Sequence, residues 1–436
     1  MREMLALVVA GTLGLFEPAR ALQAPAAGRQ PPASGSELTV YLMTMGNGDL
    51  LWERFGHNAI RIVDATRGTD SVYHWGTFDF AQPNFLRRFM TGNTLYWMQG
   101  EGMAETMELY RYRNRSVWTQ QLDLTPAERV AVRDFIAWNA KPENRYYRYD
   151  YYLDNCSTRV RDIIDRIVGG QLRIATAPRL TTATYRFHTQ RALTFDRAVA
   201  LGTDIGLGEV ADRPISQWEE SFLPSRLQAH VRALQIRSAD GSMRPLVKAE
   251  QQIFTANRPP EPTGPPSTML RNLLMGLAIA AVIGLLGRAA VSARRGPRIA
   301  FVTAATTWAA INGILGIVLI FGWTATRHVF MARNENLLQF DPLSLALAVI
   351  LPWAVMRGRG VGAARRLAVA IAVIALVGLA LKLVPLFIQK NVAVMALTLP
   401  VHLAIAWVAR ALPFAPAAAP SPKRAAAAAA VSRSAA

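Results

Sequence analysis

The sequence predicts an α+β domain outside the cytoplasm, followed by an α-helical bundle of about five transmembrane helices. Three observations lead to this fold class. The N-terminus has the pattern of an export signal, residues 37–256 carry scattered charges and many aromatics, and residues 269–410 are mostly apolar runs separated by short basic loops. The 51% hydrophobic content of the 436 residues is therefore an average over two unlike halves.

The first residues have the features of a signal peptide. Arg2 precedes an apolar stretch over 5–16, and Ala19-Arg20-Ala21 is a small-x-small pattern of the kind that signal peptidase cleaves. Glu3 and Glu17 depart from that pattern, so an uncleaved N-terminal anchor is the alternative. In either case the domain that follows is delivered across the membrane.

Composition divides the chain into six segments. The expected order is a signal peptide or anchor (1–21), a linker (22–36), a periplasmic domain (37–256), a Pro-rich linker (257–268), a transmembrane domain (269–410) and a disordered Ala-rich cytoplasmic tail (411–436). The apolar runs are 269–287, 300–323, 343–356, 367–388 and 392–410. These lengths roughly suit a hydrocarbon core of about 30 Å, and the third is short.

Arginines follow the first and third apolar runs and recur in the tail. The positive-inside rule places those three segments in the cytoplasm, which leaves the N-terminal domain and residues 324–342 outside. Most of the net charge of +18 is thus explained by topology, and it argues against nucleic-acid binding.

Local patterns predict the elements that carry the reactive residues. Residues 38–43 form a strand, and 55–63 with 71–76 alternate as two strands of a hairpin. A helix over 125–139 starts with a threonine cap, a proline and a glutamate. A second helix begins near Cys156 and ends at a pair of glycines.

Cys156 is the only cysteine, so an internal disulfide is excluded. It precedes Val160 by four residues and continues the apolar stripe of its helix, which is typical of a buried, inert thiol. The alternative is a nucleophile, because N–H groups and the macrodipole at a helix start favour a thiolate and lower its pKa. The pattern alone leaves both alternatives open.

Two histidines favour the nucleophile. His57 and His74 lie on the adjacent hairpin strands, where His57 suits the base that deprotonates Cys156 and His74 suits the group that orients His57. His188 and His230 fall in predicted helices among arginines, as on solvated faces. The sequence has no metal-ligand motif and no cofactor-binding motif, so neither a metal nor a cofactor is expected.

The external loop 326–342 is rich in hydrogen-bonding side chains, among them His328, Asn334 and Asn336. It is either a solvated connector or a lip that holds a lipid or docks the soluble domain.

The order of these motifs resembles that of known families. The chain is similar to circularly permuted papain-like enzymes, which include relatives of NlpC and of lecithin:retinol acyltransferase. The similarity lies in the order Phe55-Gly56-His57-Asn58, then 72–78, then Asp154-Asn155-Cys156-Ser157. With 218–224 and the loop 328–342, the closer resemblance is to the bacterial lipoprotein N-acyltransferase family called Lnb. His74 departs from it, because the family more often has asparagine at that place.

The resemblance implies a permuted papain-like domain in the periplasm and a multi-pass location in the bacterial inner membrane. It also implies a thiol-dependent acyltransferase that moves a fatty acyl chain, through a Cys156 thioester, from a phospholipid to the α-amino group of an apolipoprotein's lipidated N-terminal cysteine. Cys156, His57 and His74 would be catalytic, and Asn155, His328, Asn334 and Asn336 would bind substrate or support the site.

Two alternatives remain at this stage. One is a membrane-anchored cell-wall cysteine peptidase or amidase, for which a single span would suffice as anchor. The other is a non-catalytic membrane receptor or assembly factor in which Cys156 belongs to the core.

Overall fold

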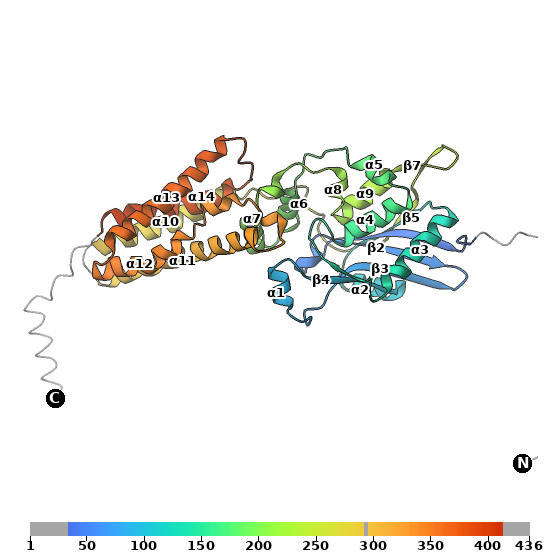
Figure 1. The fold of residues 1–436 in the computed structure, drawn as a ribbon, viewed down its shortest axis with the longest axis horizontal. Helices are drawn as coiled ribbons and strands as arrows, with labels where there is room; N and C mark the ends of the chain where they lie inside the picture. The colour runs from blue at the N-terminus through green and yellow to red at the C-terminus, as the bar shows by residue number, and fades with distance from the viewer. Residues whose placement is uncertain (1–33, 292–294, 413–436) are drawn as a thin grey trace, which may run out of the picture.

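The computed structural model describes residues 34–291 and 295–412. It contains a sheet with helices on both faces and an elongated helical bundle (Figure 1). The predicted signal segment 1–21 lies outside the described residues, as do most of the linker 22–36 and most of the tail 411–436.

The N-terminal half is built on one antiparallel sheet of seven strands in the order β6-β4-β3-β2-β1-β5-β9. The strands are β1 Leu38–Met45, β2 His57–Asp64, β3 Thr69–Thr77, β4 Leu95–Gly102, β5 Val117–Leu122, β6 Tyr146–Arg148 and β9 Val247–Phe254, with β7 Gln235–Arg237 and β8 Met243–Pro245 pairing separately. β2 and β3 form the predicted hairpin, in which Ala59 lies opposite His74.

Nine helices accompany these strands. They are α1 Phe85–Met90, α2 Met103–Tyr112, α3 Pro126–Ala140, α4 Cys156–Ile167, α5 Gln171–Thr176, α6 Tyr185–Ala192, α7 Arg197–Gly206, α8 Gln217–Glu220 and α9 Pro224–Ala233. The predicted capping box starts α3, because the Glu128 carboxylate accepts a hydrogen bond from the Thr125 N–H at 2.7 Å while the Thr125 hydroxyl accepts one from the Glu128 N–H.

The sheet is packed on both faces. One face lies against α3, α4 and α9, and α4 contributes its apolar stripe of Val160, Ile163 and Ile164 to this core. Burying a side chain of this kind contributes roughly 1.5–3 kcal/mol. The opposite face lies against α2 through Met107 and Tyr110. The helix that begins with Cys156 is therefore held against the sheet by its own hydrophobic face.

The C-terminal half is a helical bundle of α10 Met269–Val291, α11 Arg295–Thr324, α12 Leu343–Arg357, α13 Val361–Ala380 and α14 Val392–Arg410. Within the described ranges, five helical segments are long and apolar enough to cross a membrane. This confirms the predicted fold class, an α+β domain followed by a transmembrane helical region. The third candidate span starts before α12, at Val329, and includes two short 3₁₀ turns, η3 Val329–Met331 and η4 Glu335–Leu338.

The loop between α11 and α12 docks the N-terminal half onto the bundle. The Asn334 side-chain amide donates to the carbonyls of Ile205 and Gly206, both at 2.9 Å, and the Asn336 amide donates to the Ile205 carbonyl at 2.9 Å. Both asparagines are buried. The loop is therefore a structural joint and not a solvated connector.

Helix α7 completes this joint. Ile205 packs with Leu319, Phe340 and Val394 of the bundle in one buried cluster. Just beyond, 3₁₀ turn η2 (Glu209–Asp212) follows Gly208, whose N–H donates to the Phe330 carbonyl at 2.7 Å. A Cβ atom on residue 208 would lie 2.0 Å from a backbone oxygen of the loop, so only glycine fits there.

Candidate active site

Cys156 is the first residue of α4, and the side chain before it caps the helix. The side-chain oxygen of Asn155 accepts hydrogen bonds from the N–H groups of Ser157 and Thr158, both at 2.9 Å. Its amide group donates to the carbonyls of Tyr151 and Phe222, at 2.9 and 3.0 Å. Asn155 therefore fixes the start of the helix and, with it, the direction of the thiol.

The thiol lies at the end of β3, where the strand is interrupted. The register of β3 against β4 shifts between Trp75 and Thr77, and Gly76 has a φ of +104°. A Cβ atom on Gly76 would lie 3.6 Å from the Cβ atom of Cys156. Glycine here permits the left-handed backbone and leaves the cysteine open on this side. Cys156 is partly exposed.

Burial raises the pKa of the Cys156 thiol, and the nearby N–H groups of Asn58, Ser157 and Cys156 itself oppose that rise without overcoming it. The N–H groups at the helix start lower the thiol pKa as predicted, but burial outweighs them and the net shift is upward. The physical reason is desolvation, since α4 is packed against a hydrophobic core and the sulfur shares that environment. The resting group is a neutral thiol.

The two predicted histidines are in contact. Nε2 of His57 lies 3.1 Å from Nδ1 of His74, and the rings stack with centroids 5.2 Å apart. On its other side, Nε2 of His74 lies 3.1 Å from a carboxylate oxygen of Glu101 on β4, at a poorer angle than a linear hydrogen bond. Thr106 at the start of α2 donates its hydroxyl to the same Glu101 oxygen at 3.0 Å.

This row of contacts determines the proton positions. The contact with His74 lowers the pKa of Glu101, so at neutral pH a carboxylate lies 3.1 Å from His74 Nε2. With the Nε2 side of His74 facing that carboxylate, its Nδ1 is the acceptor for the Nε2–H of His57. Burial, with the positive charges nearby, holds the pKa of His57 well below its usual value, so the His57 ring is neutral. Its Nδ1 is left as a free base.

Asn58 connects the histidine strand to the cysteine helix. Its side-chain oxygen accepts a hydrogen bond from the Ser157 hydroxyl at 2.8 Å. Its side-chain NH2 group donates to Thr44 Oγ1 at 2.9 Å and to the Met43 carbonyl at 3.1 Å. Its backbone N–H lies beside the Cys156 sulfur. Among the described residues no hydrogen bond joins that sulfur to a histidine ring. Catalytic hydrogen bonds often tighten only when substrate binds.

The remaining predicted site residues lie elsewhere. His328 Nε2 is 2.9 Å from the Phe89 carbonyl, and the His328 ring stacks on Tyr151 with centroids 6.3 Å apart. Asn334 and Asn336 are engaged at the joint with α7 and have their amide groups occupied there. Asn155 caps the cysteine helix, Asn334 and Asn336 bond to α7, and His328 lies between the sheet domain and the bundle.

A second buried group of charges stabilises the segment behind the cysteine helix. Glu220 lies 3.0 Å from His188 and 3.2 Å from His230. Burial opposes ionisation of Glu220, but these hydrogen bonds and Arg226 lower its pKa to about 2. His188 is fully buried, so the expectation of a solvated face is wrong for it. The Ser221 carbonyl that follows accepts a hydrogen bond from Ser157.

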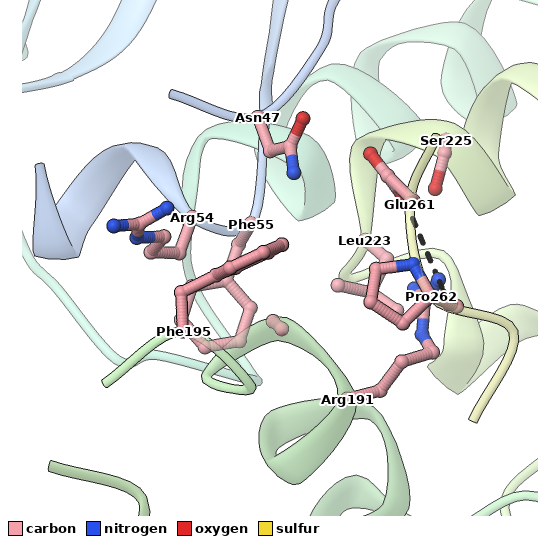
Figure 2. A pocket seen from close by; sticks show the side chains of 10 residues that line it. Asn47, Arg54, Phe55, Arg191, Phe195, Leu223, Ser225, Glu261 and Pro262 are labelled. Carbon is pink, nitrogen blue, oxygen red and sulfur yellow. Dashed lines mark hydrogen bonds and ion pairs between the residues drawn. The ribbon is translucent and has the colours of Figure 1, made fainter. Parts of the chain in front are cut away.

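A pocket beside the linker is separate from this site. It is lined by Asn47, Arg54, Phe55, Arg191, Ala192, Phe195, Leu223, Ser225, Glu261 and Pro262. Figure 2 shows Arg191 reaching Glu261 and Pro262, whose carbonyl it contacts at 3.1 Å. Neither Cys156 nor His57 lines the pocket, whose lining includes Glu261 and Pro262 of the linker. Across the part of the chain that the structure describes, no three histidine, cysteine or acidic side chains are grouped to hold a metal ion.

The fold and the site define a class: a membrane protein whose α+β domain presents a cysteine at a helix start and a histidine pair on the adjacent sheet. A family model described as the Lnb N-terminal periplasmic domain matches residues 32–191, and one described as the Lnb transmembrane domain matches residues 273–411. Together the matches cover more than half of the chain, which belongs to the Lnb family.

Comparisons with curated proteins and with solved structures found no match. Family membership indicates a function in lipoprotein biosynthesis and a periplasmic location for the N-terminal domain.

Proposed function

We propose that this chain is a thiol-dependent lipoprotein N-acyltransferase of the bacterial inner membrane. It transfers a fatty acyl chain from a membrane phospholipid to the α-amino group of an apolipoprotein's lipidated N-terminal cysteine. The observation that carries the proposal is the row His57, His74 and Glu101, next to the Asn58 N–H that lies beside the Cys156 sulfur, in a chain with both Lnb parts. The basic loops of the bundle favour a cytoplasmic C-terminus.

The first half-reaction forms a thioester. Nδ1 of His57 takes the thiol proton as the Cys156 sulfur attacks the carbonyl carbon of the phospholipid ester, and the carbonyl electron pair moves to oxygen. When that tetrahedral intermediate collapses, the ester C–O bond breaks and the leaving oxygen takes the proton from His57. The products are lysophospholipid and an acylated Cys156.

The second half-reaction forms the amide. The α-amino nitrogen of the apolipoprotein attacks the thioester carbonyl, and His57 accepts a proton from that nitrogen. Collapse breaks the C–S bond, and the sulfur takes the proton back from His57. A thioester suits this step because amines attack it readily when water is kept away.

Backbone groups near the sulfur suit the oxyanion of both intermediates. The N–H groups of Cys156 and Asn58 lie beside the thiol, whereas the Ser157 N–H is already bonded to the Asn155 side chain. In acyl transfer, one N–H donor that points at the developing oxyanion lowers the activation free energy by about 2.7–4 kcal/mol. The Asn58 side chain keeps one of the two in place.

His74 and Glu101 act on His57 and not on the substrate. Transfer of a proton to His57 creates an imidazolium whose charge is stabilised through His74 by the Glu101 carboxylate. His74 thereby has the orienting role that asparagine would fill by a single hydrogen bond. A neutral histidine has two tautomers, and the Glu101 carboxylate favours the one with the proton on His74 Nε2.

The test is mass spectrometry of lipoprotein N-termini from a strain whose only candidate acyltransferase is this protein. We expect N-acylated termini with the wild-type chain and free α-amino groups with Cys156→Ser at equal membrane levels. Unacylated termini with a correctly inserted wild-type chain would overturn the proposal. Cleaved cell-wall peptides in their place would favour the peptidase.

A further inference from the structure

An exposed apolar surface lies on the N-terminal domain beside the bundle. It consists of Trp52, Phe78, Phe80, Phe85, Leu86 and Phe89, which we call the aromatic ridge. Trp52, Phe80 and Leu86 are 56%, 61% and 68% exposed. The rings contact one another, with Phe78 and Phe80 at 4.9 Å and Phe80 and Phe85 at 5.1 Å between centroids. The ridge is thus one continuous surface and not a set of scattered side chains.

Contacts with the bundle determine the height of the ridge above the membrane. Helix α11, a candidate membrane span, ends at Thr324. Just past that end, the Arg327 N–H donates to the Thr91 carbonyl at 3.0 Å, and His328 contacts the Phe89 carbonyl. Helix α1 therefore lies beside the end of the bundle, as Figure 1 shows. The ends of membrane-spanning helices lie at the level of the lipid headgroups, where aromatic side chains are favoured.

The charges around the ridge match a phospholipid surface. Arg87 and Arg88 lie on α1 next to the exposed Leu86, and Arg327 lies on the adjoining loop. Within 34–291 and 295–412, none of the three makes an ion pair. Apolar side chains flanked by uncompensated arginines are the pattern of an interfacial membrane contact.

The ridge also connects to the thiol. Phe78 contacts Tyr96 with centroids 4.9 Å apart, and Tyr96 stacks on Tyr149 at 4.2 Å. Phe78 follows Gly76 by two residues, and Gly76 lies against Cys156. Tyr149 and Cys156 pack against the same hydrophobic core. The row of rings thus extends from the headgroup level to the reactive sulfur.

We infer that the aromatic ridge inserts into the periplasmic leaflet and passes an acyl chain of a glycerophospholipid along Phe78 and Tyr96 to Cys156. This inference rests on the proposed function and adds the route by which the donor reaches the thiol. The occupant is a bilayer phospholipid, because the surface joins the end of a membrane helix and carries the charge opposite to phosphate.

Depth measurement tests the insertion without relying on activity. The full chain with Cys156→Ser carries one new cysteine, Leu86→Cys or the control Met243→Cys, and a nitroxide label in vesicles of phosphatidylethanolamine and phosphatidylglycerol. Met243 is 56% exposed and lies on β8, away from the bundle. We expect the Leu86 label to collide with oxygen and to be shielded from a water-soluble nickel chelate. Equal access of the chelate to both labels would overturn the inference.

Activity then tests the route. Leu86→Gln with Phe80→Gln should lower thioester formation from vesicle phospholipid at least tenfold and leave acylation by a water-soluble short-chain ester within twofold. The control is Ile174→Gln, which replaces an apolar side chain that is 72% exposed on α5. Equal losses with both donors would contradict the route. If the wild-type chain shows no acylation while the Leu86 label is buried, the proposed function fails and the insertion stands.

Discussion

Glu101 provides the sharpest test of the active-site reasoning. The change Glu101→Gln preserves size and removes the charge next to His74. A charge-assisted hydrogen bond contributes about 1.5–3 kcal/mol and a neutral one about 0.5–1.5 kcal/mol. Because the Glu101 side chain is 30% exposed, we take the difference between the lower ends of the two ranges, about 1 kcal/mol. At about 1.4 kcal/mol per factor of ten, thioester formation should slow about fivefold.

The assay is the single-turnover rate of Cys156 acylation, followed by intact mass in detergent-phospholipid micelles. Glu108→Gln is the matched control, since Glu108 is an exposed residue of the neighbouring helix α2. Removal of a negative charge also makes His57 a weaker base, so the acid limb of the pH–rate profile should move to lower pH while KM stays unchanged. A rate within twofold of both wild type and Glu108→Gln would refute the proposed proton row.

Three further predictions concern the thiol, the joint and the buried carboxylate. Alkylation of Cys156 by iodoacetamide should rise continuously with pH, because burial raises the thiol pKa and the pKa of neutral His57 is lowered; a reactive plateau below pH ~6.5 would indicate an ion pair instead. Gly208→Val should lower Tm because the new side chain meets the loop backbone, whereas Gly202→Ala, with open space around it, should not; equal Tm values would contradict the close approach. Glu220→Gln should lower the free energy of unfolding by about 3 kcal/mol at neutral pH, because the Glu220 pKa is lowered from 4.5 to about 2. This stabilisation is complete above pH ~4.5 and is lost as the pH falls towards 2. Urea unfolding at pH 7 and pH 3 measures the loss, and a difference between wild type and variant that does not change with pH would count against the prediction.

Local patterns carried most of what the sequence could predict. The hairpin with His57 and His74 and the helix start at Cys156 each depend on a few adjacent residues, so alternation and capping are sufficient to find them. The apolar runs of the bundle are equally local. The catalytic roles of these residues remain predictions that the experiments above address.

The features that could not be predicted from the sequence depend on contacts between distant segments. Glu101 lies on a strand next to glycines, and only the pairing of β3 with β4 brings it to His74. His188 has arginines around it in the sequence, yet its partner Glu220 comes from another helix and makes it a buried residue. The net direction of the thiol pKa could not be predicted for the same reason, since the helix start is visible in the sequence and the depth of burial is not.

The joint between α7 and the bundle also affects which molecules can react. The sheet domain is held by hydrogen bonds from the Asn334 and Asn336 side chains and from the Gly208 N–H to backbone carbonyls. The height of Cys156 over the bilayer therefore depends on these bonds and not on the length of the Pro-rich linker. Insertion of extra residues into that linker should therefore leave the reaction unchanged. Such a protein would select membrane-bound substrates by depth: carbonyls and amino groups that reach the plane of Cys156 at the membrane surface would react, and those held deeper in the bilayer would not.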